Sequence, residues 1–386
     1  MLGVYVHFPF CHRLCPFCDF YVQTKFDQSL IDQYTQALIQ EIHLYQEYGW
    51  KKENEITSIY FGGGTPSLIS PFHLDTVLRR LQKYFPFSDF FEITLESNPE
   101  DVHVDRAQSW KRLGINRISL GVQSIDDKQL KKLGRSHKSK DVYESMRILR
   151  KAGFENISMD LLFALEDQSL QDWKTTLDRA ISCSPEHISC YQLTIEENTH
   201  FDKLVEEGRM KLPIDDVVAD MILRGREQLI LSGYRPYEIS NAARKGFEST
   251  HNLGYWKGHP YWGIGVSAHS FQLNNGRIRR FQNPKNLVSY VQSMTHSKPD
   301  YICEDLSPKT LWEDLLLTGL RLEEGIDIKY YEKKFGPAPK SFLDNIETLC
   351  QSHLVYKQGN LTLRTQHIPI LNEVLHRIFT PSCEAA

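Results

Sequence analysis

The chain has 386 residues, a length that suggests two or three domains rather than one small one. Lys and Arg number 45 against 49 Asp and Glu, and this balance argues against electrostatic binding of nucleic acid or of an anionic membrane as the main function. No apolar run is long enough to cross a bilayer, and the first residues carry neither the basic segment nor the cleavage site of a secretion signal. We therefore expect a cytoplasmic protein with no transmembrane segment and no nucleic-acid partner.

Short β-rich runs alternate with helix-period segments through the first half of the chain, which is the pattern of βα units around a parallel sheet. The predicted strands are residues 3–7, 55–61, 91–96, 117–122, 156–161 and 187–193. The predicted helices are residues 29–48, 73–84, 105–113, 141–152 and 170–182, and Gly114 and Gly153 stand where two of them should end. The fold class is therefore α/β, but six such units fit either a doubly wound sheet or a barrel-like array.

The alternation of predicted strands and helices ends after residue 193. A helix at 215–231 leads into a stretch rich in glycine and aromatic residues at 250–271. Further helices are predicted at 311–320, 328–334, 341–352 and 370–379, with a hairpin turning at Gly359-Asn360 before the last of them. This order predicts a small, mostly helical, winged-helix-like domain, and the absence of a basic stripe favours packing or partner docking over DNA binding. We expect a core barrel at 1–240, a linking segment at 241–300 and the C-terminal domain at 301–386.

Three of the eight cysteines, Cys11, Cys15 and Cys18, lie within eight positions directly after the first predicted strand. The other five are scattered, which does not suit a disulfide framework. Three thiolates can bind three irons of a 4Fe-4S cubane and leave the fourth iron open for an external ligand. A zinc site is the alternative, with His7 or His12 as a fourth ligand. The aromatic and proline residues of this loop would shield a cluster from solvent, and they favour the iron–sulfur interpretation.

The segment from Tyr5 through the three cysteines to Phe20 resembles the cluster loop of radical S-adenosylmethionine (SAM) enzymes. It is most similar to the branch that contains oxygen-independent coproporphyrinogen III oxidase and its haem-chaperone relatives, the HemW-type proteins. The resemblance runs through nearly the whole chain. It implies a partial (β/α)6 radical-SAM barrel, a 4Fe-4S cluster on the three cysteines, and SAM chelating the fourth iron. By position it also implies that Tyr5 and Phe17 bind SAM, with Phe17 against the adenine.

Further residues match SAM-contacting positions of the same family, and all but Arg135 stand at the ends of predicted strands or directly after them. They are Gly63, Gly64, Thr65, Glu96, Gln123, Arg135 and Asp160. Each alone would more often belong to a turn, a helix cap or the surface. Because the carboxyl ends of parallel strands form one face of a barrel, we expect these residues to lie together on that face.

The segment His251-Asn-Leu-Gly-Tyr-Trp256 lies outside the alternating strands and helices of the predicted barrel. It matches the HNxxYW signature of the haem-chaperone branch. A histidine among aromatic residues is more often a packed loop residue than a ligand. However, an imidazole can bind haem iron, and Tyr255 and Trp256 could stack on a porphyrin. The resemblance therefore makes His251 the candidate haem contact, with Asn252 expected to hold its second ring nitrogen.

Two departures from the oxidase pattern distinguish the branches. Phe20 stands where the oxidase has a fourth cysteine, and only ten residues precede Cys11 where the oxidase has a long arm. We therefore expect a haem chaperone that binds a 4Fe-4S cluster, SAM and haem and passes haem to an acceptor protein. The first alternative is an anaerobic coproporphyrinogen III oxidase that decarboxylates propionate side chains by a SAM-derived radical. The second is a zinc-stabilised binding module. SAM cleavage and a homodimer are both compatible with the sequence.

Overall fold

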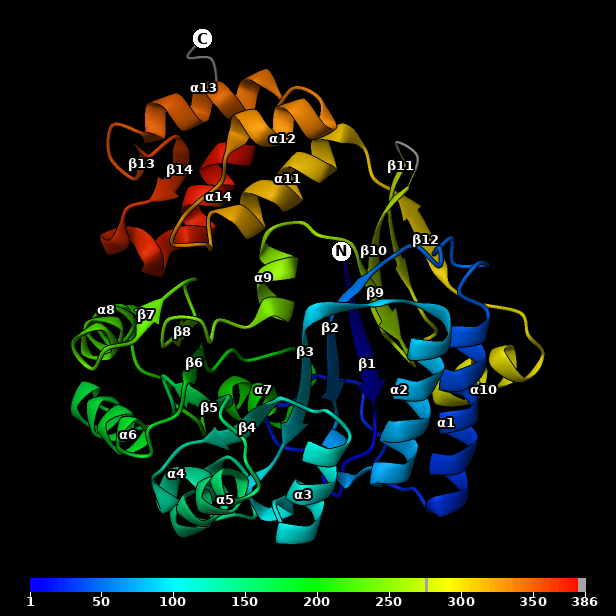
Figure 1. Cartoon of the computed structure of the whole chain (residues 1–386). Coiled ribbons are helices and arrows are strands. Elements are labelled where there is room, and N and C mark those ends of the chain that lie inside the picture. The colour runs from blue at the N-terminus through cyan, green and yellow to red at the C-terminus, as the bar shows by residue number, and fades with distance from the viewer. Residues whose placement is uncertain (275–276, 381–386) are drawn as a thin grey trace.

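The computed structural model describes residues 1–274 and 277–380, and within them twelve strands form one sheet (Figure 1). Six strands lie in the sheet in chain order, each parallel to the next. They are β1 (Leu2–Phe8), β2 (Ile56–Gly63), β3 (Phe87–Ser97), β4 (Arg117–Gln123), β5 (Ile157–Phe163) and β6 (His187–Gln192). A doubly wound sheet would reverse its strand order at a switch point, and this sheet does not. β1 and β6 pair with other strands rather than with each other, so the barrel is open. This confirms the partial (β/α)6 barrel.

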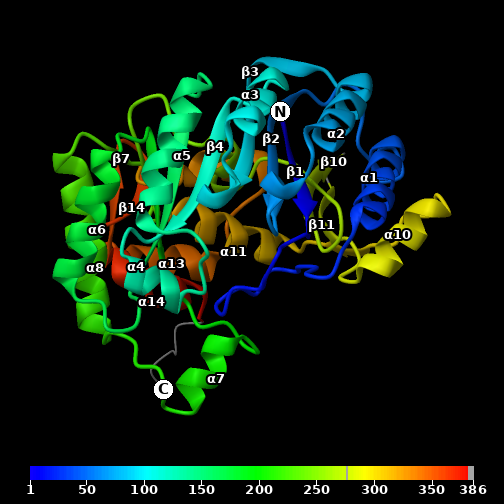
Figure 2. The ribbon, with the colours of Figure 1, turned by 90° about the horizontal axis from the view of Figure 1, so that it is seen from below.

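Helices cover the outer face of the parallel strands (Figures 1 and 2). They are α1 (Gln28–His43), α2 (Pro71–Tyr84), α3 (Val104–Arg112), α4 (Asp127–Lys132), α5 (Ser139–Lys151), α6 (Leu170–Ser182) and α8 (Asp215–Leu231). Helix α7 (His200–Glu206) lies apart from them (Figure 2) and packs on the loop after β1, where the amide of Phe201 donates a 3.1 Å hydrogen bond to the carbonyl of Pro16. Short 3-10 turns follow β2 and β3 at η1 (Pro66–Leu68) and η2 (Pro99–Asp101). Gly114 and Gly153 follow α3 and α5 with φ of 85° and 88°, the left-handed conformation that ends a helix, as the sequence predicts.

The sheet continues beyond the six parallel strands on both sides. On the β6 side it adds β8 (Asn241–Ala243) and β7 (Arg235–Pro236). On the β1 side it adds β9 (Tyr261–Ile264), which is parallel to β1, and then antiparallel β10 (His269–Asn274), β11 (Arg277–Gln282) and β12 (Ile302–Asp305). Helices α9 (Thr250–Trp256) and α10 (Leu287–Thr295) belong to the same stretch. Residues 241–300, expected to link two domains, thus contribute four strands to the sheet. The domain boundaries at 240 and 300 stay a prediction.

The C-terminal elements follow the predicted order of three helices, a hairpin and a last helix. They are α11 (Pro308–Gly319), α12 (Ile328–Phe335), α13 (Lys340–Leu349), β13 (Leu354–Lys357), β14 (Asn360–Leu363), η3 (Thr365–Ile370) and α14 (Leu371–Phe379). The hairpin turns at Gln358 and Gly359, both with positive φ, one residue earlier than expected. Cys383 and the last residues of the expected domain lie outside the described residues.

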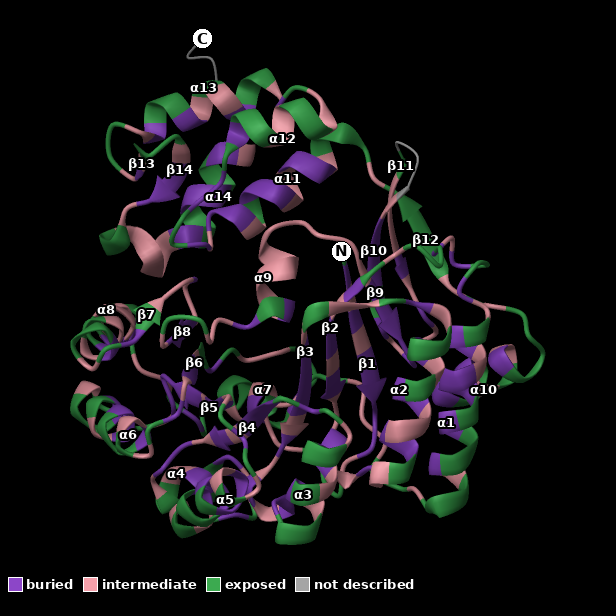
Figure 3. Ribbon diagram, in the orientation of Figure 1, coloured by how far each residue is buried: buried purple, intermediate pink, exposed green. Residues whose placement is uncertain are grey.

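Two large apolar cores and a smaller third cluster, around Leu133, Leu162 and Phe201, stabilise the described part of the chain. The larger fills the space between the barrel strands and the outer helices, and the second lies inside the C-terminal elements (Figure 3). Polar contacts join the two parts. The buried carboxylate of Glu238 accepts a 3.3 Å hydrogen bond from Arg321, and Tyr331 donates a 2.9 Å hydrogen bond to the carbonyl of Lys257. The C-terminal elements therefore pack against the side of the sheet on which the barrel is open.

Candidate functional site

The loop after β1 brings the three cysteines to the carboxyl end of the barrel. Two backbone hydrogen bonds join the start of this loop to its end. The amide of Gln23 donates to the carbonyl of Pro9 at 2.6 Å, and the amide of Cys11 donates to the carbonyl of Gln23 at 3.2 Å. The amide of Cys18 donates 3.1 Å to the carbonyl of Cys15, which closes a tight turn between the second and third cysteine. All three thiols are half-buried and line one cavity of about 520 Å³.

The glycine run that ends β2 packs directly on this loop. A Cβ on Gly64 would lie 2.8 Å from backbone atoms of Pro9 and Phe10, and one on Gly63, whose φ is 110°, would lie 2.6 Å from the ring of His7. The glycines are thus required by a close approach to the cluster loop, in addition to the approach to a ligand that the sequence suggested. The following Thr65 lies with its hydroxyl 3.0 Å from the sulfur of Cys11.

Two carboxylates face the same cavity from neighbouring parts of the sheet. Glu96 accepts hydrogen bonds from the hydroxyl of Tyr60 at 2.9 Å and from the amide of Gly63 at 3.2 Å. Burial raises the pKa of Glu96 to about 7. Asp160 accepts hydrogen bonds from the hydroxyls of Ser119, Ser158 and Ser189 at 2.8, 3.1 and 2.7 Å. Among the described residues no basic side chain forms an ion pair with either carboxylate, a setting that suits a cationic ligand.

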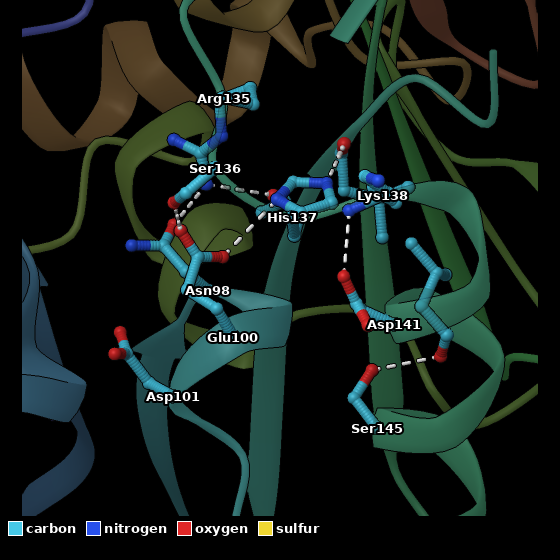
Figure 4. A network of polar contacts seen from close by, with 12 residues as sticks. Asn98, Glu100, Asp101, Arg135, Ser136, His137, Lys138, Asp141 and Ser145 are labelled. Carbon is cyan, nitrogen blue, oxygen red and sulfur yellow. Dashed lines mark hydrogen bonds and ion pairs between the residues drawn. The ribbon is translucent and has the colours of Figure 1, made fainter. Parts of the chain in front are cut away.

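Arg135 lies on the opposite rim and is held by a polar network that Figure 4 shows. Its guanidinium donates to Asn98 Oδ1, to the carbonyl of Gly121 at 3.2 Å and to the sulfur of Cys15 at 3.6 Å. Nearby, Glu100 accepts hydrogen bonds from Ser136 and from the buried ring of His137. Although burial acts to raise the pKa of Glu100, these hydrogen bonds hold it at about 2. The network therefore carries a fixed negative charge behind the arginine.

Most of the predicted site residues meet in this one cavity, hereafter the cluster cavity. Those that line it are Cys11, Cys15, Phe17, Cys18, Gly63, Gly64, Thr65, Glu96, Gln123, Arg135 and Asp160. Tyr5 and His251 line a neighbouring cavity instead. Among residues 1–274 and 277–380, no three His, Cys, Asp or Glu side chains are placed to share a single metal ion. The three cysteine thiols share this cavity without forming such a group.

The neighbouring cavity, hereafter the second cavity, is larger, at about 1160 Å³. Its wall is made by β1, the cluster loop, α9, β10, β11 and α11, so it lies between the barrel and the C-terminal elements. Cys18, Phe20, Tyr60, Gly63 and Glu96 line both cavities, which are therefore adjacent. Phe20, at the position of the oxidase's fourth cysteine, is 62% exposed at this shared boundary.

His251 differs from its expected arrangement. The side chain is only 3% exposed, and both ring nitrogens are engaged: Nδ1 lies 2.9 Å from the hydroxyl of Ser58 and Nε2 lies 2.7 Å from the hydroxyl of Tyr255. The prediction that Asn252 orients this ring is wrong, because Ser58 of β2 and Tyr255 occupy both positions. Burial, followed by the charge of Arg117, lowers the pKa of His251 to about 3. His251 could bind iron only after losing one of these hydrogen bonds.

The rest of the HNxxYW segment also joins parts of the fold. The buried carboxylate of Glu92 on β3 accepts from the amides of Thr250 and His251 at the start of α9, at 3.1 and 3.2 Å. At the other end of this helix, the guanidinium of Arg321 lies over the ring of Trp256 at 4.5 Å. Helix α9 thus connects the barrel to the C-terminal elements.

Some residues of the cluster cavity were not predicted. Asn98 and Ser119 contact predicted residues, and Tyr191, Gln192 and Thr194 stand at the end of β6. The last three could have been found, because the sixth strand was predicted and its end must share the face of the other five. Ser119 could not, because a serine inside a predicted strand carries no sign of its partner.

An open (β/α)6 barrel whose first strand leads into three clustered cysteines defines a radical SAM protein. In agreement, the model of the Radical SAM superfamily matches residues 5–180 and the model of the HemN C-terminal domain matches residues 306–368. The solved structure of coproporphyrinogen III oxidase (HemN) from Escherichia coli, a radical SAM enzyme, superposes with a TM-score of 0.81. The superposition covers 98% of this chain and 90% of that chain at 21% identity, which shows a shared fold.

Curated relatives identify the branch. "Heme chaperone HemW" of Bacillus subtilis is 33% identical over 97% of this chain and 98% of its own length. The protein of the same name from Haemophilus influenzae is 32% identical over 98% of both chains. The chain belongs to the HemW family of haem chaperones within the radical SAM superfamily.

The cavity fits the cofactors of this class, a 4Fe-4S cluster and SAM. Three cysteine thiols line this cavity, and a 4Fe-4S cubane held by three thiolates keeps one iron open for an external ligand. Glu96 and Asp160 place two carboxyl groups in the wall of this cavity, a setting that fits the ammonium and sulfonium groups of SAM. When bound, the cluster supplies an open iron site at which SAM can be held.

Proposed function

We propose that this protein binds haem beside its cluster and SAM and transfers the haem to an acceptor apoprotein. The family of the chain supports this function. The roles of the individual residues follow the same proposal: Cys11, Cys15 and Cys18 hold the cluster, and the other predicted residues of the cluster cavity surround SAM.

The observation that carries the proposal is the second cavity. Binding sites for small molecules commonly measure about 300–1,000 Å³ and are mostly apolar, and this cavity of about 1160 Å³ has room for a porphyrin. Its apolar wall includes Tyr261 and Phe271 on the sheet and Leu311 and Leu315 on α11. Aromatic and aliphatic side chains of this kind suit the flat apolar face of a porphyrin.

The same proposal includes the cellular compartment of the protein and its partners. No helix in residues 1–274 and 277–380 is long and apolar enough to span a membrane. The seven cysteines of these residues are free of disulfides, which fits a reducing compartment, and we propose the cytoplasm. Besides the acceptor, a second copy of the chain is the partner that we propose to test, by light scattering.

The decisive experiment offers the cluster-reconstituted protein haem and coproporphyrinogen III in parallel, under anaerobic, reducing conditions with saturating SAM. We expect one haem per chain, transfer of that haem to an added apo-haemoprotein, and no protoporphyrinogen. Phe20 is the reason to expect no decarboxylation, because a phenyl ring supplies neither a thiolate nor a hydrogen bond. Absence of haem binding would contradict the proposal, and steady protoporphyrinogen formation would favour the oxidase.

A further inference from the structure

Four imidazoles face the second cavity, and two of them have no hydrogen-bond partner among residues 1–274 and 277–380. The ring nitrogens of His7 lie 3.1 Å from the hydroxyl of Tyr5 and 3.1 Å from the carbonyl of Tyr21. Those of His251 are engaged as described above. The rings of His259 and His269 make no hydrogen bond or ion pair within the described part of the chain. An iron ligand must offer a free ring nitrogen, so only these two qualify without loss of an existing contact.

The sheet directs His269 into the cavity. β10 and β11 pair antiparallel, with His269 opposite Gln282 and Phe271 opposite Arg280. Residues two apart on a strand share a face, as do directly opposed residues, and all four of these side chains line the cavity. His259 lies in the loop after α9 and also lines a separate cavity beside the N-terminus. Of the two histidines, His269 is therefore the one whose direction into the second cavity is fixed by strand pairing.

The same ribbon carries positive charge beside His269. Arg280 lies 3.1 Å from Asp314 and 3.3 Å from Glu304, so its charge is already balanced. Lys285, three residues after β11, also lines the cavity and has no ion pair or side-chain hydrogen bond among the described residues. Haem presents iron at its centre and two propionate carboxylates at its edge. An unpaired ammonium group is a natural partner for one of those carboxylates.

We propose that, in the haem-loaded protein, the imidazole of His269 binds the iron and the ammonium group of Lys285 binds a propionate. This assignment rests on the proposed function and extends it, because it places the haem against the β10–β11 ribbon. His251 then has a structural role in α9 rather than a role as iron ligand.

The test uses resonance Raman spectra and haem titrations of the cluster-reconstituted protein. His269→Ala should change the ligation state of the iron and weaken haem binding by at least about tenfold, as the loss of a metal's supporting contacts does. Added imidazole should restore the wild-type spectrum, which a merely structural defect would not allow. The residue is exposed and makes no side-chain hydrogen bond, so circular dichroism and cluster absorbance should stay unchanged.

Matched variants complete the design. His259→Ala and His251→Ala should retain the wild-type haem spectrum. Lys285→Gln should weaken binding of haem severalfold while leaving the affinity for haem dimethyl ester unchanged, because the ester has no carboxylate to pair. An unaltered spectrum in His269→Ala, with wild-type protein binding haem normally, would overturn the ligand assignment and leave the proposed function standing. Failure of the wild-type protein to bind haem would instead refute the proposed function itself.

Discussion

Cys11, Cys15 and Cys18 act as a set, because a cubane held at only two corners is labile. Replacing any one of them by Ala should therefore abolish the broad iron–sulfur absorbance after anaerobic reconstitution. The iron and sulfide contents of the variant protein should fall together with the absorbance. Cys183 and Cys303 lie outside the cluster cavity and serve as matched controls: their Ala variants should keep full absorbance. Full iron content in Cys15→Ala would refute the assignment of the cluster.

The binding of SAM should depend on pH through Glu96. The pKa of this buried carboxyl is raised to about 7, so the group is ionised at pH 8 and protonated at pH 6. Only the ionised form attracts a cation, and the affinity for SAM should fall as the pH is lowered, by up to about tenfold per unit below the pKa.

The control for this pH dependence is Glu96→Gln. It should bind SAM weakly at every pH and lose the part of the dependence that belongs to Glu96, while any titration of SAM itself remains in both proteins. Isothermal titration of the cluster-loaded protein between pH 6 and 8 measures the difference. Equal pH profiles for the two proteins would contradict the role of Glu96.

The residues of the cluster cavity were more predictable than those of the second cavity, for a physical reason. Glu96 and Gln123 stand at or near the ends of parallel strands, and the topology brings these ends together wherever the strands are recognised. The partners of His251 could not be predicted. Ser58 is 193 positions away in the sequence, and only the packing of α9 on β2 brings its hydroxyl to the ring.

At the scale of elements, α9 should contribute to stability through His251. His251→Ala removes the partner of the buried hydroxyl of Ser58 and of the partly buried hydroxyl of Tyr255. Each unsatisfied buried group costs about 1–3 kcal/mol, so the free energy of unfolding should drop by about that amount or more. His353→Ala, in the C-terminal elements, is the control and should change stability little. Equal denaturation midpoints for the two variants would contradict the conclusion that the hydrogen bonds of His251 stabilise the fold.

The same scale shows which elements the sequence predicts and which it does not. Helices α6 and α8 have the predicted bounds: α6 begins with a capping box at Ser169 and Asp172, and α8 begins with two acidic residues in its first turn. The strands β9 to β12 were not predicted. β9 and β12 have only four residues each, and glycine and aromatic residues around β9 give no alternation from which to recognise a strand. Their existence depends on pairing with the edge of the barrel.

For the whole molecule, the junction between barrel and C-terminal elements depends on Glu238. This carboxylate is buried, and burial raises its pKa even though Arg321 lies beside it. Arg321→Ala would leave the buried carboxylate without its cation, a change that costs about 3–5 kcal/mol in comparable pairs. We expect faster hydrogen exchange in α11 and η3. Arg209→Ala, which breaks an exposed ion pair, is the control and should leave exchange in both elements unchanged.

The boundary that the two cavities share has a consequence for how the ligands are handled. Tyr60, Gly63 and Glu96 line both spaces, so a group that settles in one of them changes the wall of the other. If SAM alters the affinity for haem by some factor, haem must alter the affinity for SAM by the same factor, because the coupling free energy is reciprocal. The concentration of SAM would then set how firmly haem is held, and the loss of SAM from the cluster cavity would change how readily haem leaves.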